Sequence, residues 1–368
     1  MKILHIINDL RSGGAEKLIE ISLPLYNDEI DISVELLILS DKRKEYYQNL
    51  INNNIKIHIS PINSMRNPLN VIYINKVIEK GGFDVVHAHL FPSFYWVSIA
   101  TILKHHSKIK FVMTEHSTNN KRRENKYLRV LEKFIYGRYD IIHSISEDTQ
   151  INLIEWLKPQ TRVLDRFKII ENGIEVNKFK NANPLDRRLI HSGLKFDEKE
   201  KIICMTGSFT KQKDQMTIIK AMLQLPRYYH LLLIGEGPLK AEYIIAVKAL
   251  NLDNRVHFLG FRNDVQNILK SIDLFILSSY WEGFGLAAVE GMASGKPVLA
   301  SNVSGLKNVI NDQELLFEPG NVDELVGKIM NLLNDAQLYD EKARQCELNA
   351  EKYDINEMVN QYIESYRL

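Results

Sequence analysis

The chain has 368 residues and lacks several features that would narrow its class. Only two cysteines are present, Cys204 and Cys346, so a disulfide framework is excluded and a reducing cytosol is expected. No window approaches the roughly 18 consecutive apolar residues of a transmembrane helix. The first residues, MKILHIIND, lack the long uncharged core of a signal peptide. These absences predict a cytoplasmic protein.

Sequence repeats and low-complexity tracts are also missing. The composition is that of an ordinary globular protein, with 45% hydrophobic and 25% charged residues. The formal net charge is +1, and we expect no nucleic-acid partner. The length favours two domains, each large enough to bury a core.

Short apolar runs alternate with longer segments of helical period in both halves of the chain. The strand candidates are KILHII, ISVELLIL, IKIHIS, DVVHAHL, IKFVMTE and DIIHSIS in the first half, and KIICMTG, HLLLIGEG, RVHFLG, DLFILSS and KPVLAS in the second. Alternating strands and helices are typical of parallel sheets covered by helices on both faces. The fold class is therefore α/β, with two doubly wound, Rossmann-like domains.

The domain boundary is predicted near residue 180, where the polar segment KFKNANPLDRRLIHSG interrupts the periodicity. This divides the chain into domains 1–180 and 181–352. A final amphipathic helix, 353–368, places Met358, Val359, Tyr362, Ile363 and Tyr366 on one face. That face must cover either its own domain or the first one.

The segment SSYWEGFGLAAVEGMASGKPVLAS, residues 278–301, carries the most specific pattern. An apolar strand, a loop containing Gly283 and Gly285, and the start of a helix together favour anion binding, because free backbone N–H groups and the helix dipole point at the ligand. Glu282 and Glu290 bracket this loop. A carboxylate at Glu290 suits the vicinal hydroxyls of a ribose. The alternative is that both are ordinary charges, although apolar neighbours argue against a solvated Glu290.

This segment resembles the signature of family 4 of the retaining glycosyltransferases, which have the GT-B fold. Other pieces of the chain resemble the family in the same order: INDLRSGGAEK, DVVHAHL, IENGIEVNKF, LLLIGEGP, RVHFLGFRND and GKPVLAS. The resemblance implies that domain 1–180 binds the acceptor and domain 181–352 binds the nucleotide sugar, with a cleft between them. It also implies sugar transfer with retention of configuration and without a cofactor or bound metal. The absence of an Asp-x-Asp motif agrees with that.

The family stabilises the departing diphosphate with an Arg and a Lys after the first strand of the second domain. Lys213 falls on the Lys position of GSFTKQKDQ, whereas Ser208 replaces the Arg. Either Lys211 or another cation substitutes, or Ser208 donates a weaker hydrogen bond. A solvated lysine at a helix start is the alternative for Lys213, in a position that the helix dipole disfavours.

Histidines follow or occupy several strands of the first domain. The resemblance places His116, in VMTEHST, against the donor sugar. His87 and His89 share one face of a strand, because they are two residues apart. A metal would need a third ligand, which the sequence gives no reason to expect, so packing or acceptor contact is predicted for this pair.

The predicted catalytic residues are His116, Lys213 and Glu282. The predicted substrate-binding residues are Gly13, Gly14, Gly207, Ser208, Lys213, Gly237, Phe261, Arg262, Glu282, Phe284, Gly285, Leu286 and Glu290. For Gly235 and Gly237 a tight turn is an equally good explanation.

Residues 121–138, KRRENKYLRVLEKFIYGR, are read as one basic amphipathic helix. Such a surface would bind either the anionic lipids on the inner face of a membrane or the phosphate of an acceptor. A solvated face over a buried apolar stripe is the alternative.

The function predicted from these residues is transfer of a hexosyl or N-acetylhexosaminyl group to an acceptor hydroxyl. A UDP-sugar is the favoured donor, and a lipid-linked or surface polysaccharide precursor is the expected acceptor. Other possibilities are an epimerase or phosphorylase on the same fold, or a non-catalytic binding protein. The donor sugar, the linkage and the oligomeric state are not specified by the sequence.

Overall fold

The computed structural model describes residues 1–368 except residues 12, 105, 119, 191–195 and 198. Two compact units are present: residues 1–173 with 355–368, and residues 174–354. The first boundary thus falls at Gly173 and Ile174, earlier than the predicted residue 180. Within the predicted linker, residues 191–193 lie outside the described residues.

Unit 1 is built on a seven-stranded parallel sheet with the order β3-β2-β1-β4-β5-β6-β7. Its strands are β1 (Lys2–Ile7), β2 (Ser33–Ile38), β3 (Lys56–Ile59), β4 (Val85–His89), β5 (Lys110–Glu115), β6 (Ile141–Ser144) and β7 (Phe167–Ile169). Every strand but β7 was expected. Nearly continuous burial along β1, β2, β4, β5 and β6 reflects a sheet that is covered on both faces, whereas the edge strands β3 and β7 are more exposed.

Helices connect the strands of unit 1: α1 (Gly14–Tyr26), α2 (Tyr47–Asn52), α3 (Asn70–Gly81), α4 (Ser93–Leu103), α5 (Leu128–Tyr136) and α6 (Glu147–Leu157). The C-terminal helix α15 (Ile355–Arg367) completes the unit. Short 3-10 turns occupy Lys121–Glu124 and Thr161–Arg166.

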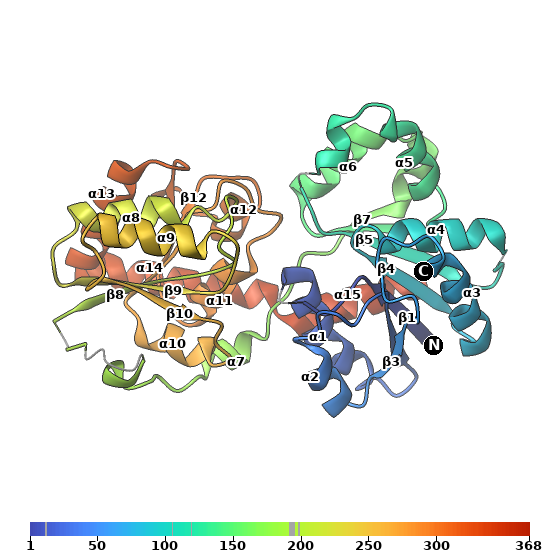
Figure 1. The fold of residues 1–368 in the computed structure, drawn as a ribbon, viewed down its shortest axis with the longest axis horizontal. Helices are drawn as coiled ribbons and strands as arrows, with labels where there is room; N and C mark the ends of the chain where they lie inside the picture. Colours follow the sequence, from blue (N-terminus) through green and yellow to red (C-terminus); the bar gives the residue numbers. More distant parts are fainter. Residues whose placement is uncertain (12, 105, 119, 191–195, 198) are drawn as a thin grey trace. The chain divides into compact units, whose positions relative to one another are not determined.

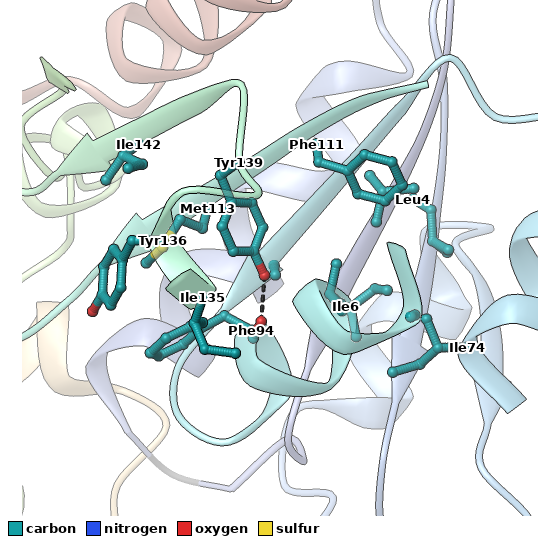
Figure 2. Close-up of a cluster of buried hydrophobic side chains, with 14 of the residues drawn as sticks. Leu4, Ile6, Ile74, Phe94, Phe111, Met113, Ile135, Tyr136, Tyr139 and Ile142 are labelled. Carbon is teal, nitrogen blue, oxygen red and sulfur yellow. Dashed lines mark hydrogen bonds between the residues drawn. The ribbon is translucent and has the colours of Figure 1, made fainter. Parts of the chain in front are cut away.

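One hydrophobic core of unit 1 lies between the sheet and α3, α4, α5 and α6. Strand residues such as Leu4 and Met113 meet helix residues such as Ile74 and Phe94 there (Figure 2). The hydroxyl of the buried Tyr139 donates to the backbone oxygen of Phe94. Burial of these side chains is the main force that holds the helices to the sheet.

The C-terminal helix α15 packs with unit 1, beside α1 (Figure 1, in red). All five residues of its predicted apolar face are buried. The two tyrosines of that face, Tyr362 and Tyr366, pack against His87 of β4. The helix therefore covers the sheet face on which polar side chains gather.

Unit 2 contains a six-stranded parallel sheet with the order β10-β9-β8-β11-β12-β13. Its strands are β8 (Lys201–Thr206), β9 (Tyr229–Ile234), β10 (Val256–Gly260), β11 (Leu274–Leu277), β12 (Val298–Ser301) and β13 (Leu316–Phe317). Its helices are α7 (Val176–Lys180), α8 (Gln215–Gln224), α9 (Lys240–Ala249), α10 (Val265–Ser271), α11 (Leu286–Ala293), α12 (Leu306–Ile310), α13 (Val322–Asn334) and α14 (Ala336–Ala350). Short 3-10 turns occupy Arg187–Leu189, Gln313–Leu315 and Glu351–Tyr353.

The prediction of one basic helix over 121–138 is wrong. A 3-10 turn ends at Glu124, and α5 begins only at Leu128. Asn125 separates them, and its side-chain oxygen accepts from the backbone N–H of Tyr127 at 3.0 Å. Asparagine favours such local bonds over a continuous helix. Within the described residues, no helix is long and apolar enough to cross a bilayer.

Candidate functional site

The strand order of unit 2 marks where a ligand would bind. Strand β8 lies between β9 and β11, so the connections after β8 and β11 leave the sheet in opposite directions. Ligands of open α/β sheets bind at such a switch point, outside the carboxyl ends of the strands. The loops at this position, 207–214 and 278–285, contain most of the predicted donor residues.

Lys213 and Glu282 connect these two loops through an ion pair. The carboxylate of Glu282 is buried and also accepts from Ser279 Oγ at 2.7 Å. The backbone strengthens the junction, because Tyr280 N–H donates to the oxygen of Gln212 at 2.8 Å. Two residues that lie far apart in sequence therefore meet at the switch point.

Gly285 starts α11 with a φ of +102°, a conformation that strongly favours glycine. A Cβ at this position would also lie 2.4 Å from Leu306 Cδ2, so the leucine side chain would have to shift. The first amides of α11 have no partner within the helix and carry partial positive charge. A phosphate is the type of group that such a helix start binds.

The remaining residues of this loop differ in exposure. Glu290 is half-buried in the second turn of α11, and Leu286 is half-buried in the first. Phe284, in contrast, is buried, and its ring packs edge-on against Tyr353 with a centroid distance of 5.3 Å. The Phe284 side chain thus belongs to the core of unit 2, and only its backbone is left for the predicted substrate contact.

Glycines after β8 and β9 pack backbone against backbone. A Cβ on Gly235 would lie 2.1 Å from the oxygen of Gly207, and one on Gly237 would lie 2.5 Å from the nitrogen of Phe209. These contacts explain the glycines as close packing between loops, without a ligand. Ser208, between Gly207 and Phe209 in the sequence, is exposed.

Phe261 and Arg262 follow β10. Phe261 is exposed, whereas Arg262 is held by Asp264 through bonds of 2.7 and 2.6 Å and by the oxygen of Ile190 at 3.2 Å. An arginine with these partners has less freedom to reach a phosphate than the sequence implied.

In unit 1 the equivalent switch point lies between β1 and β4. Gly13 precedes α1, and the exposed Gly14 is its first residue. Close to them in sequence, Arg11 Nε lies 2.8 Å from Asp9 and 3.4 Å from Glu16. Burial raises the pKa of Glu16 from 4.5 to about 7.

His116 follows β5 and is half-buried, beside the same end of the sheet. Its Nε2 lies 3.1 Å from His89 Nδ1, and His89 Nε2 lies 3.0 Å from His5 Nδ1. One ring nitrogen from each of His5, His87 and His89 lies within 4.8 Å of the other two, so the third histidine that the sequence gave no reason to expect is present. The pairing of His5 with His87 in register across β1 and β4 explains this.

Arg122 and Arg123 are fixed by buried carboxylates. Arg122 Nε donates to Glu132 at 2.9 Å and Arg123 Nη2 donates to Glu115 at 3.0 Å. The guanidinium of Arg122 also stacks over Phe91, 4.2 Å from the ring centroid. These two cations are therefore structural, with side chains only 18% and 11% exposed, and they are not available as part of the basic surface predicted for residues 121–138.

A cavity of about 260 Å³ in unit 2 contains none of the predicted residues. It is lined by residues of β12, α13 and α14, among them Leu299, Leu332 and Lys342. The chemistry of the two loops at the switch point is a better guide to the site than this cavity.

Two family models match the chain. The model of glycosyltransferase family 4 covers residues 29–178, and that of group 1 glycosyl transferases covers residues 186–353. The chain belongs to glycosyltransferase family 4 and has the GT-B fold. It is therefore a glycosyltransferase.

Curated relatives of the glycosyltransferase include two transferases whose names specify diphospho-undecaprenol compounds. A Campylobacter jejuni N-acetylgalactosamine-N,N'-diacetylbacillosaminyl-diphospho-undecaprenol 4-alpha-N-acetylgalactosaminyltransferase is 24% identical over 370 residues, covering 96% of each chain. An Escherichia coli UDP-Gal:alpha-D-GlcNAc-diphosphoundecaprenol alpha-1,3-galactosyltransferase is 25% identical over 298 residues, covering 76% of this chain and 73% of the relative.

Among solved structures, the Anabaena protein HepE in complex with UDP has the same fold. The TM-score is 0.84 at 22% identity, with 99% of both chains covered. At this identity the similarity shows the fold alone.

Proposed function

We propose that this glycosyltransferase transfers a hexosyl or N-acetylhexosaminyl group from a UDP-sugar to an acceptor hydroxyl with retention of configuration. The observation that carries the proposal is the Lys213–Glu282 pair beside the helix start at Gly285, because it puts a cation and free amides where a diphosphate would bind. The complex of HepE with UDP supports the choice of nucleotide.

In the proposed reaction, the bond from the anomeric carbon to the diphosphate oxygen breaks. A bond to the acceptor oxygen forms on the same face of the sugar, and the acceptor proton passes to a diphosphate oxygen. Lys213 and the amides of α11 stabilise the charge that grows on the leaving group. Glu290 binds the ribose hydroxyls, and His116 hydrogen-bonds the transferred sugar.

A donor screen tests the proposal. We expect calorimetry to show binding of UDP in preference to GDP and ADP, and turnover to release UDP from one UDP-sugar. NMR of the product should show the anomeric configuration of the donor. Consumption of inorganic phosphate without nucleotide release would instead identify a phosphorylase, and binding without turnover of any donor would identify a binding protein.

The proposed chemistry needs no metal, because cations of the protein and helix amides take the role of the metal at the diphosphate. We expect excess EDTA to leave the initial rate nearly unchanged. Complete loss of activity, restored by magnesium or manganese, would contradict this mechanism.

The acceptor is proposed to be lipid-linked and to be reached at an anionic membrane surface. The two relatives above act on diphospho-undecaprenol compounds. In this chain, four apolar side chains on α5 and its N-cap are exposed: Tyr127 (90%), Val130 (75%), Leu131 (45%) and Phe134 (51%). Their spacing puts them on one helix face, and exposed Lys126 and Lys133 flank them. Apolar anchors beside cations suit an anionic bilayer.

Vesicle flotation tests this membrane contact. Val130→Ser with Phe134→Ser should reduce recovery with anionic vesicles, while Ile245→Ser, an equally accessible apolar position in α9, should not. Lys126→Glu with Lys133→Glu should weaken binding by roughly 1 kcal/mol per cation. Equal recovery of the wild type with neutral and anionic vesicles would leave α5 as a solvated face.

A further inference from the structure

Three imidazoles form a hydrogen-bonded chain from the surface of unit 1 into its interior. The chain runs from the half-buried His116 through His89 to His5, which is 1% exposed. The rings of His5 and His89 lie nearly parallel, with an interplanar angle of 12°. The chemistry proposed above uses only the outermost of these rings.

All three rings are neutral near pH 7. Burial lowers the pKa of His5 to about 3 and that of His116 to about 4. Burial, followed by the nearby histidines, lowers the pKa of His89 well below its ordinary value. A neutral imidazole carries one N–H and one acceptor nitrogen. Because His89 is bonded at both nitrogens, it must donate on one side and accept on the other.

Only two proton arrangements satisfy both hydrogen bonds. In the first, His116 and His89 donate from Nε2, and the single N–H of His5 is on Nε2. In the second, His5 and His89 donate from Nδ1, and the single N–H of His116 is on Nδ1. The state of His5 Nε2 therefore determines the state of His116.

His5 Nε2 is buried and has no hydrogen-bond partner among the described residues. The first arrangement would put a proton there and leave a buried N–H without an acceptor, which is rare in proteins. The second leaves only a lone pair unpaired, a defect that proteins tolerate more often. The second arrangement is therefore favoured.

We propose that His5 and His89 are positioning residues that hold His116 in its Nδ1–H form. His116 Nδ1 makes no hydrogen bond within the described part of the chain, so this N–H is offered to a ligand oxygen. Only the assignment of that oxygen to the transferred sugar rests on the proposed function. The proton arrangement itself follows from the contacts of unit 1.

A metal held by His5, His87 and His89 is the competing explanation, since one ring nitrogen of each lies within 4.8 Å of the other two. His87, however, is bonded at both nitrogens, to Tyr366 OH at 2.6 Å and to Thr114 Oγ1 at 2.8 Å. A metal would have to displace one bond of His87 and one of His89. The hydrogen-bonded chain keeps all of these bonds.

NMR of the ligand-free full chain with ¹⁵N-labelled histidine tests the proposal directly. Two-bond ¹H–¹⁵N correlations near neutral pH should show the proton on Nδ1 in His5, His89 and His116. A proton on Nε2 of His116 would overturn the proposal. Added Zn²⁺ should leave these signals in place, and loss of the His5 and His89 N–H signals on zinc binding would establish the metal site instead.

A matched pair of variants tests the consequence for turnover. His5→Asp puts an acceptor near the position of Nδ1 and reverses both hydrogen bonds, whereas His5→Asn can keep an N–H there. We expect His5→Asp to move the proton of His116 to Nε2 and to lower kcat about five- to tenfold, with little change in donor KM, and His5→Asn to keep values close to those of the wild type. His143→Phe serves as the control, because His143 is equally buried but hydrogen-bonds Ser365 and none of the three histidines.

The proposal and the assigned function fail separately. A proton on Nδ1 together with full activity of His116→Phe would keep the histidine chain and remove His116 from catalysis. Dependence of turnover on His116 with its proton on Nε2 would keep the function and overturn the histidine chain.

Discussion

Lys213, on the loop after β8, forms an ion pair with Glu282, on the loop after β11. Their side chains are 18% and 7% exposed, so water screens the pair only weakly. Ser279 donates to the same oxygen of Glu282 at 2.7 Å. The lysine is thereby held at the switch point of unit 2, where the diphosphate of a donor would compete for its charge.

Replacing Lys213 by Ala should lower kcat by about 10²–10³-fold while weakening UDP binding much less, because charge on the diphosphate grows towards the transition state. Steady-state kinetics and calorimetry with UDP measure the two effects. Lys240→Ala, which removes a lysine paired with the exposed Glu236, is the control. Equal losses in binding and turnover would mean that Lys213 contributes to donor binding without further stabilising the transition state.

Replacing Glu290 by Ala should weaken UDP binding by about ten- to a hundredfold, since a charge-assisted hydrogen bond to a ribose hydroxyl contributes on the order of 1.5–3 kcal/mol. Calorimetry on the folded variant checks this. Glu242→Ala, at an exposed position of α9, should bind UDP like the wild type. An unchanged dissociation constant for Glu290→Ala would remove this residue from the site.

Ser208→Arg restores the residue that the family has at this position. Ser208 is exposed, so the larger side chain can be accommodated without disturbing the core. We expect activity to hold or rise, because a second cation would stabilise the leaving diphosphate. If the variant remains folded but its kcat collapses, the local geometry has been built around the small serine.

Glu132 should be among the most sensitive positions for the stability of unit 1. The carboxylate is fully buried and accepts from Tyr95 OH at 2.7 Å, Arg122 Nε at 2.9 Å and Trp156 Nε1 at 2.6 Å. Glu132→Ala leaves these donors unpaired and should lower the free energy of unfolding by about 3–5 kcal/mol. Urea denaturation measures this, with exposed Lys133→Ala as the control at about 0.5 kcal/mol or less. Similar midpoints for both variants would contradict the structural role.

Glu16 should make stability depend on pH. Burial raises its pKa from 4.5 to about 7, so between these values the folded chain binds a proton that the unfolded chain has released. The unfolding free energy should therefore fall as pH rises through this range, by about 2–3 kcal/mol from this group. Glu16→Gln cannot ionise and should be more stable than the wild type above pH 7. If the difference in unfolding free energy between the wild type and Glu16→Gln stays constant from pH 4.5 to pH 7, the prediction is wrong.

The two sheets and the loop from Glu282 to Gly285 could be predicted from local patterns. Alternating apolar runs and helical periods predicted every strand except the short β7 and β13. The loop from Glu282 to Gly285 was recognisable because its strand, glycines and helix start follow one another directly in the sequence. Period alone could not tell that the apolar face of α5 is exposed, since a helical stripe looks the same whether it is covered or not.

By itself, then, the sequence determined the fold class, the family and the short segments that contain the proposed site residues. Only the tertiary structure decided which distant side chains meet. Lys213 reaches Glu282 because β8 and β11 are neighbours in the sheet. His5 joins His89 and His116 because β1, β4 and β5 lie side by side, in an order that hydrogen bonding between strands sets and that no local propensity encodes.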